Sequence, residues 1–215
     1  YQYLTLTSLY GKTTQAVERT AIIEAFGQIL QHPEFIKAYG SKYIEVKSYI
    51  IKLLVNLSKS GDSGIVAAAS VILKDPKSGA KGFVSDTTWF ESSRLRLKLP
   101  QDVESYNELL QARAFLFDST YTAYKAPYSH PIDFSALEAQ GDSIEVVMKT
   151  TKGNITLLLF TDKAPGTVAN FLELCQKDFY DNKFFHRVVP NFVVQAGCPR
   201  GDGYGGLNYT IRSEL

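Results

Sequence analysis

Apolar residues in the first half of the chain recur at spacings of three and four, the pattern of α-helices that bury one face. Between residues 14 and 31 the stripe consists of Val17, Ala21, Ile22, Ala25, Phe26, Ile29 and Leu30. A second stripe covers residues 43–57, and Gly61 ends it. Shorter stripes follow between residues 63 and 117, the first of them after Asp62 and Ser63, which suit a helix N-cap. We therefore predict four or five helices before residue 120.

Two arrangements of these helices fit the pattern. Helices joined by short polar turns can stack in pairs as a solenoid, in which each pair buries its stripe on the next. The same stripes can also close around one core as a compact helical bundle. We favour the solenoid, and the irregular spacing of the stripes leaves the bundle open.

The helical pattern breaks between Tyr121 and Gly141, where Tyr, Pro and Ser dominate. Pro127 and Pro131 require extended backbone around them, so we place a linker at residues 121–141. After Asp142 the apolar period changes from about 3.6 to about 2. The chain therefore consists of an all-α region, 1–120, and a mainly-β region, 142–215.

The second region predicts strands around one helix. Ile144, Val146 and Met148 alternate with less apolar neighbours, and a second apolar run, 155–160, completes a β-hairpin. Pro165 then opens a helix that reaches Cys175. The segments 184–189 and 192–196 read as two further strands, separated by a turn at Pro190 and Asn191.

The amino-acid composition argues against a membrane-spanning protein and a nucleic-acid-binding protein. The chain has 215 residues, of which 45% are hydrophobic and 21% charged, as in ordinary soluble globular proteins. With 23 Lys and Arg against 22 Asp and Glu, the net charge of +1 argues against nucleic acid as a partner. The longest uncharged apolar stretch, 64–73, is too short to span a membrane. Cys175 and Cys198 match no zinc spacing. Because the chain opens at Tyr1, we expect further sequence upstream.

Three motifs carry a resemblance to a known family. They are APGTVANFLEL from Ala164, FYDNKFFHRVVPNFVVQAG from Phe179, and PRGDGYGG from Pro199. In order and spacing they resemble the cyclophilin family of peptidyl-prolyl isomerases. The resemblance implies an eight-stranded closed β-barrel capped by two helices, with an X-Pro substrate on an outer face. It covers only residues 142–215, about the first half of such a domain. We therefore expect the barrel to be truncated, and this chain alone to be inactive and prone to aggregation.

The helical region carries a second resemblance. The segment from Leu99 to Ser135, with PQDVESYNELLQ and YSHPIDFSAL, is similar to that of bacterial cyclophilins preceded by HEAT-type repeats. This implies a bacterial protein in a periplasmic or other extracytoplasmic compartment rather than the cytoplasm. It also implies that the helices bind clients or a partner protein.

The chemistry of the family explains the candidate catalytic residue. Rotation about an X-Pro bond faces a barrier of about 18–20 kcal/mol because amide resonance keeps the bond planar. A fixed cation that donates to the prolyl nitrogen stabilises the twisted form more than the planar one. Arg187 resembles that group. An arginine on an edge strand is usually only a surface residue, and it is the surrounding motif that favours catalysis here.

The same motifs supply the candidate substrate-binding residues. Phe192 and Val193 resemble the floor of the proline pocket, although the family more often has Met where Val193 stands. Gln195 can donate its amide to a substrate carbonyl and accept from a backbone N–H. In the glycine loop, Gly203 lets the substrate backbone pass closely. Core packing is the alternative for Phe192, and an ordinary strand hydrogen bond is the alternative for Gln195.

His186 is the remaining polar candidate. The reaction moves no proton, so we predict a hydrogen-bonded structural role for His186, in support of the site, rather than acid–base chemistry. The loop 201–206 fits G-x-G-x-x-G, but no helix follows to hold a phosphate, which excludes a dinucleotide site. The tripeptide Arg200-Gly201-Asp202 is discounted as a chance match to an adhesion motif.

The sequence therefore predicts a peptidyl-prolyl cis-trans isomerase whose helical repeats bind clients. Its partners would be proline-containing peptides and unfolded or folding proteins, and no metal or organic cofactor is needed. The alternative is a binding module that grips proline-containing segments on a helical scaffold without isomerising them. A purely helical adaptor with an incidental β tail fits the dense motifs less well.

Overall fold

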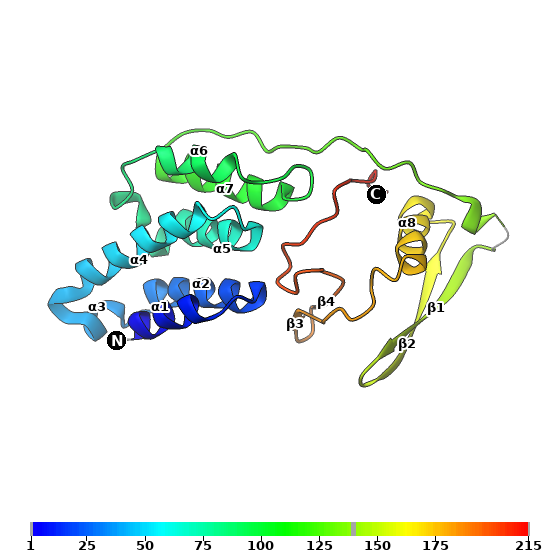
Figure 1. The fold of residues 1–215 in the computed structure, drawn as a ribbon, viewed down its shortest axis with the longest axis horizontal. Helices are drawn as coiled ribbons and strands as arrows, with labels where there is room; N and C mark the ends of the chain where they lie inside the picture. Colours follow the sequence, from blue (N-terminus) through cyan, green and yellow to red (C-terminus); the bar gives the residue numbers. More distant parts are fainter. Residues whose placement is uncertain (1, 139–140, 215) are drawn as a thin grey trace. The chain divides into compact units, whose positions relative to one another are not determined.

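Helices fill the first part of the chain in the computed structural model, which describes residues 2–138 and 141–214 (Figure 1). Over the described residues the α-helices before residue 120 are α1 (Gln2–Lys12), α2 (Ala16–Gln31), α3 (Phe35–Tyr39), α4 (Tyr43–Ser58), α5 (Ser63–Lys74), α6 (Thr88–Arg94) and α7 (Val103–Leu116). Short 3₁₀ turns at Gly40–Lys42, Pro76–Ser78 and Ala80–Gly82 connect them. None of the described helices is long and apolar enough to cross a membrane.

The prediction of four or five helices missed α1 and α3. In α1 the leucines and threonines alternate, which reads as a strand, whereas the residues packed on the core are Tyr3, Leu6 and Tyr10 at helical spacing. The helix α3 has only five residues, too few to show a period. The boundaries of α2 and α4 agree with the predicted stripes to within two residues.

Helix α5 is the centre of the helical core. It packs against α2, α4 and α7, and Figure 1 shows it between α2 and α7. Ten of its residues are buried, including the run Ala67–Ala69, whose small side chains let neighbouring helices approach closely. Fully buried Phe26, Leu54 and Leu109 come from the helices around it. A helix enclosed on several sides is typical of a bundle, and the predicted HEAT-like repeats are not confirmed.

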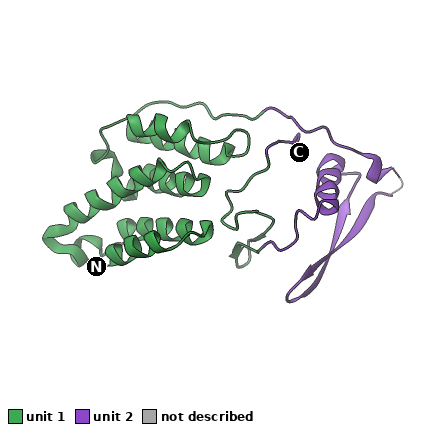
Figure 2. Ribbon diagram, viewed as in Figure 1, with its two compact units in different colours: residues 1–126, 184–207 green, residues 127–183, 208–215 purple. Residues whose placement is uncertain are grey.

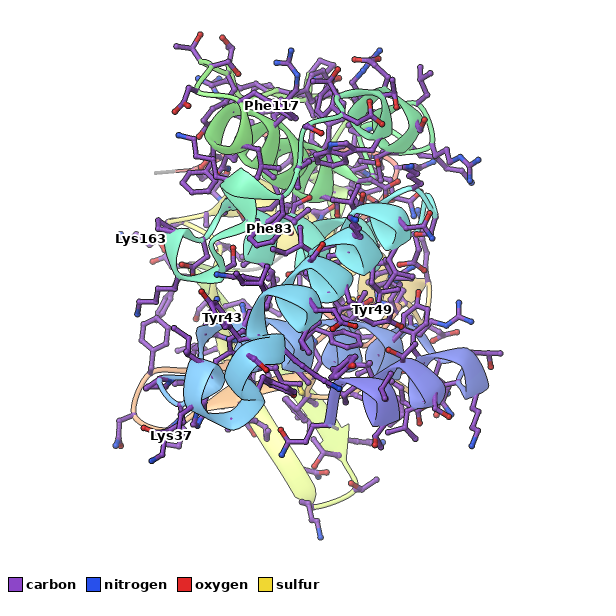
Figure 3. The ribbon with its side chains drawn as sticks, turned by 90° about the vertical axis from the view of Figure 1, so that its left-hand side faces the viewer. Lys37, Tyr43, Tyr49, Phe83, Phe117 and Lys163 are labelled. Atoms are coloured by element: carbon purple, nitrogen blue, oxygen red, sulfur yellow. The ribbon has the colours of Figure 1, made fainter. Side chains whose placement is uncertain are left out.

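Two local interactions fix the ends of these helices. Asp62 is the N-cap of α5, as predicted, because its Oδ1 accepts a hydrogen bond from the backbone N–H of Ile65 at 3.1 Å. At the other end of the bundle, the ring of Tyr3 lies 6.0 Å from that of Tyr39 and 5.4 Å from that of Tyr49, which is labelled on α4 in Figure 3. These edge-on contacts join α1, α3 and α4.

The contacts of the chain form two compact units, coloured in Figure 2. The first contains residues 1–126 and also 184–207, and the second contains 127–183 and 208–215. The hydrophobic pattern did not indicate that 184–207 packs with the helices. As a domain boundary, the linker at 121–141 stays a prediction.

The second unit is built on a hairpin and a helix. Strands β1 (Ser143–Thr150) and β2 (Gly153–Phe160) pair antiparallel, and α8 (Pro165–Gln176) follows. Ile144, Val146 and Met148 are half-buried while their neighbours are exposed, which confirms the predicted alternation. Glu214 accepts hydrogen bonds from the backbone N–H groups of Gly166 and Thr167 at 2.8 and 2.7 Å, so it caps α8.

The strands do not form the barrel that the family resemblance implies. Over the described residues β1 pairs only with β2, and β3 (Arg187–Val189) pairs only with β4 (Val193–Gln195). Large apolar side chains on these strands are exposed, among them Leu158, Phe160, Val188 and Val194. A closed barrel is therefore not confirmed, because within the described ranges these strands have no further partners to complete a sheet and bury those side chains.

The central packing predicts how the bundle responds to a cavity. Leu54→Ala removes most of a fully buried side chain and leaves an apolar cavity in the core. We expect it to lower the free energy of unfolding by about 2–5 kcal/mol. Val71→Ala on α5, where the side chain is 42% exposed, is the control and should change it by less than about 1 kcal/mol. Urea unfolding followed by circular dichroism measures both; equal losses would contradict the assigned core.

Candidate functional site

The hairpin of β3 and β4 presents the predicted arginine. Arg187 lies opposite Gln195 in the antiparallel register, and the backbone N–H of His186 donates to the carbonyl of Gln195 at 3.0 Å. Asn191 takes a positive φ of 59° in the turn, a conformation that asparagine tolerates better than most residues. The N–H of Phe192 closes the turn on the carbonyl of Val189 at 3.1 Å.

A side-chain hydrogen bond holds the arginine in this hairpin. Nη1 of Arg187 donates to Oε1 of Gln195 at 3.2 Å, across the strand pair. Gln195 therefore accepts from the guanidinium rather than from a backbone N–H, and its amide NH₂ group stays available to a ligand. Among the described residues, the other donors of the exposed Arg187 fork have no hydrogen-bond partner, so they can act on a bound group.

Arg187 and Gln195 line a cleft of about 520 Å³ within the first unit. The other lining residues come from the glycine loop and from one face of α2; they are Val17, Thr20, Ala21, Glu24, His186, Gly201, Asp202, Gly203 and Tyr204. The apolar stripe between residues 14 and 31 predicts Val17 and Ala21 on the buried face of this helix. Both are exposed and face the cleft, since the core side of α2 is formed by Ile23, Phe26 and Leu30.

Two predicted pocket residues lie apart from this cleft. Phe192 is 79% exposed at the tip of the hairpin, and neither it nor the half-buried Val193 belongs to the cleft lining. An aromatic floor for proline needs a second apolar wall, and the described residues place none over Phe192. The structure therefore brings together Arg187, Gln195, His186 and Gly203, but not Phe192 and Val193.

His186 packs beneath the glycine loop. Its Nδ1 is buried without a hydrogen-bond partner among the described residues, so the predicted side-chain hydrogen bond is not formed. Gly203 has a φ of +86°, and a Cβ there would lie 3.5 Å from Nε2 of His186. The left-handed backbone is what requires glycine at this position.

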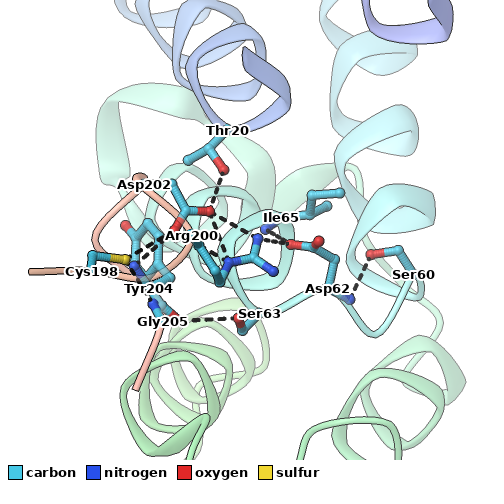
Figure 4. A network of polar contacts seen from close by, with 10 residues as sticks. All are labelled: Thr20, Ser60, Asp62, Ser63, Ile65, Cys198, Arg200, Asp202, Tyr204 and Gly205. Atoms are coloured by element: carbon cyan, nitrogen blue, oxygen red, sulfur yellow. Dashed lines mark hydrogen bonds and ion pairs between the residues drawn. The ribbon is translucent and has the colours of Figure 1, made fainter. Parts of the chain in front are cut away.

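The loop 198–206 is fastened to the helices by a partly buried ion-pair network, drawn in Figure 4. Nη2 of Arg200 donates to Oδ1 of Asp62 at 2.6 Å and to Oδ2 of Asp202 at 2.9 Å. The Asp202 side chain is only 1% exposed, and its carboxylate also accepts from Thr20 Oγ1 at 3.3 Å and from the N–H of Tyr204 at 3.0 Å. The guanidinium thus bridges the α5 cap and the glycine loop.

The electrostatics of the network favour its charged form. Burial acts to lower the pKa of Arg200, but its hydrogen bonds with Asp202 and Asp62 outweigh burial and raise that pKa. Burial likewise acts to raise the pKa of Asp202, and the hydrogen bonds from Arg200 and the Tyr204 N–H leave it lowered. At the cleft wall the pKa of Glu24 is raised, first by burial and then by the charge of Asp202.

Small residues allow the loop to approach this closely. A Cβ on Gly64 would lie 2.4 Å from Oδ2 of Asp202, and one on Gly206 would lie 2.5 Å from the carbonyl oxygen of Gln101. Between them, Oγ of Ser63 donates to the carbonyl of Tyr204 at 3.1 Å. At positions 64 and 206 the close approach of the loop therefore depends on glycine.

Sequence reasoning missed the docking network and the α2 wall. Arg200 and Asp62 are 138 residues apart, and the local sequence gives no sign that they pair. Arg200 and Asp202 belong to a tripeptide that the sequence alone presents as a chance match, although two opposite charges in a glycine-rich loop are a weak sign of a fixed turn. In the described ranges no three His, Cys, Asp or Glu side chains gather as metal ligands.

Comparison with known proteins finds a family match in the second part of the chain. Residues 145–214 match the family model described as cyclophilin type peptidyl-prolyl cis-trans isomerase/CLD. Similar proteins include a peptidyl-prolyl cis-trans isomerase of Synechococcus elongatus, 49% identical over 71 residues, and peptidyl-prolyl cis-trans isomerase B of Bacillus subtilis, 57% identical over 56 residues. A Helicobacter pylori isomerase is 50% identical over 68 residues.

These matches cover only part of each protein. They involve 33%, 26% and 32% of this chain, and 49%, 39% and 42% of the relatives from Synechococcus, Bacillus and Helicobacter, so the chain spans about half or less of their length. No solved structure matches the chain significantly. The helices before residue 127 lie outside the family match, and the matched segment 145–214, which contains Arg187 and its hairpin, is similar to the cyclophilin type of peptidyl-prolyl cis-trans isomerase.

Proposed function

We propose that this chain is part of a peptidyl-prolyl cis-trans isomerase that acts on X-Pro bonds and uses Arg187 as its catalytic residue. The observation that carries the proposal is the Arg187 guanidinium, held by Gln195 in a cleft of the cyclophilin-type segment. Proline-containing peptides and unfolded or folding proteins are the proposed substrates.

The geometry suits catalysis by differential binding. In the planar ground state, resonance withdraws the lone pair of the prolyl nitrogen, and in the twisted state the nitrogen becomes pyramidal and accepts a hydrogen bond. A free N–H of the Arg187 fork would donate to that nitrogen and lower the barrier without moving a proton. Since arginine stays protonated at all physiological pH values, catalysis should not depend on titration of this group.

Gln195 and Gly203 would position the substrate. The Gln195 amide NH₂ is free because the Oε1 atom accepts from Arg187, so it can donate to a carbonyl of the peptide. Gly203 leaves room for the peptide backbone, and His186 packs against the loop that carries it. We keep Phe192 and Val193 as the proposed floor for the proline ring, which a further apolar wall would complete.

The alternative is a module that binds proline-containing segments without isomerising them. The exposed Phe192 favours it, because a proline ring can stack on an aromatic face without further assistance from the site. Line broadening of the cis and trans signals of a bound peptide in exchange NMR separates the two: only an isomerase interconverts them faster than the free peptide does.

Removing the guanidinium is the direct test. In the full-length protein Arg187→Ala should lower kcat/KM for a proline tetrapeptide by at least about tenfold, because one charged donor to the transition state is lost. Arg187→Lys keeps the charge but not the fork held by Gln195, and should recover only part of the loss. Arg212→Ala, an exposed arginine outside the cleft, is the matched control. Undiminished turnover by Arg187→Ala would remove this residue from the mechanism.

The helices are proposed to contact protein clients. The support is a pair of exposed apolar side chains, Ile36 at 61% on α3 and Ile44 at 54% on α4. Ile44→Ser should slow catalysed refolding of a proline-limited protein by about twofold or more while tetrapeptide turnover stays unchanged, since a remote contact raises the local concentration of protein substrates only. Stopped-flow refolding and a peptide assay on the same sample measure this; parallel changes in both assays would contradict client binding at Ile44.

A further inference from the structure

The cleft beside Arg187 has two walls of different origin. One wall is the cyclophilin-type hairpin with Arg187 and Gln195, and the other is the face of α2 that carries Val17, Thr20 and Glu24. A peptide held by the arginine would therefore also contact the helical bundle, because a volume of about 520 Å³ accommodates only a few residues of chain.

The α2 face has the spacing of a continuous strip. Its members Val17, Thr20, Ala21 and Glu24 lie three, one and three residues apart, which places them on one side of a helix over two turns. Val17 is 43% exposed, so this side of α2 is not buried in the helical core. It offers an apolar stretch that ends at a carboxylate.

The ion-pair network fixes the two walls relative to each other. Asp202 belongs to the glycine loop and accepts from Thr20 of α2, while Arg200 joins the same loop to the cap of α5. All of these groups lie within the first unit of the chain. The loop that carries Gly203 is therefore held against the helices, with the cleft directly beside the contact.

Among the residues that the structure describes, Glu24 is the carboxylate of the cleft that has no ion-pair partner. Asp202 pairs with Arg200, whereas Glu24 is exposed on the cleft wall, where desolvation and the nearby negative charge of Asp202 raise its pKa. A substrate that brings a positive charge to this wall would compensate Glu24, and one that brings a negative charge would be repelled.

We infer that α2 is the second wall of the substrate cleft and that Glu24 on it selects X-Pro segments with a lysine or arginine next to the proline dipeptide. This inference rests on the proposed isomerase function and adds its substrate class. It assigns Glu24 as a specificity-determining residue, and Arg200, Asp202 and Asp62 as positioning residues that keep the wall in place.

Three peptides that differ at one flanking position test the selection. For the full-length wild type, kcat/KM for a Lys-flanked X-Pro peptide should exceed that for the Ala-flanked one by about three- to fivefold, the effect of one partly exposed charge pair, and the Glu-flanked peptide should be poorest. Glu24→Gln should bring the Lys to Ala ratio close to one, and Glu24→Lys should invert it. Glu18→Gln, on the same helix but outside the cleft, should leave the ratio and the basal activity unchanged.

Other outcomes would overturn the inference. One is a ratio of kcat/KM for the Lys-flanked and Ala-flanked peptides that is unchanged in Glu24→Gln, and another is a wild type that shows no preference among the peptides. A third is an equal rise in the turnover of all peptides in Glu24→Gln, which would show that Glu24 blocks the cleft. Dissociation constants for the same peptides, measured by titration, test whether α2 contacts the substrate even if no turnover is found. If the protein binds peptides with this charge preference but does not isomerise them, the proposed function is refuted, while the inference that α2 forms a wall of the cleft is supported.

A glycine pair tests the positioning of the wall. Gly64→Ala would place a Cβ 2.4 Å from Oδ2 of Asp202 and 2.9 Å from Oγ1 of Thr20, so the loop must move away from α2, while alanine itself favours the helix. We expect KM for all three peptides to rise several-fold, with kcat changed less. Gly11→Ala on α1, where a Cβ would have no atom within 4 Å, is the control. An unchanged KM in Gly64→Ala, with the same melting temperature as the control, would refute the coupling.

Discussion

The docking of the glycine loop on the helices depends on the guanidinium of Arg200, which lies between the carboxylates of Asp62 and Asp202. Asp62 uses the same oxygen to cap α5 and to bind Arg200, so the start of the central helix and the docking of the glycine loop share one acceptor. Partly buried charges tolerate little loss of partners, since removing one leaves the others desolvated and unpaired. The network therefore acts as one unit.

The position of the network gives it influence over the candidate site. It fixes the loop that contains Gly203, against which His186 packs, and His186 precedes Arg187 in the hairpin. On the other side it fixes the face of α2. The guanidinium of Arg187 thus faces a cleft whose shape is set by helices that lie outside the cyclophilin-type match, which is a closer association than two domains joined by a linker would need.

Local patterns predicted the local structure well. The helices α2, α4, α5 and α7, the first hairpin and α8 all follow from periodicity, capping and turn residues, because each is decided within about ten residues of sequence. The exceptions were α1, whose alternating leucines resemble a strand, and the short α3. Val17 and Ala21 were misplaced because periodicity identifies an apolar face but does not say whether a core or a cleft lies against it.

The site was predictable only as far as its motifs are contiguous. Arg187, Gln195 and His186 lie in one run of sequence, and the structure brings them together with Gly203. The pairing of Arg200 with Asp62 depends on how the chain returns to the bundle after a long excursion, and no local rule gives that. The same limit applies to Phe192, because an aromatic pocket needs a partner wall that is remote in sequence.

The long separation between Asp62 and Arg200 also has a consequence for synthesis on the ribosome. The capped end of α5 and the exposed face of α2 are translated well before the glycine loop, and segments of a chain generally fold from the N-terminus onward as they emerge. The bundle can therefore be complete when Arg200 leaves the tunnel, and the loop then docks on a finished surface. In that order, the cleft opens to proline-containing chains only after its helical wall is in place.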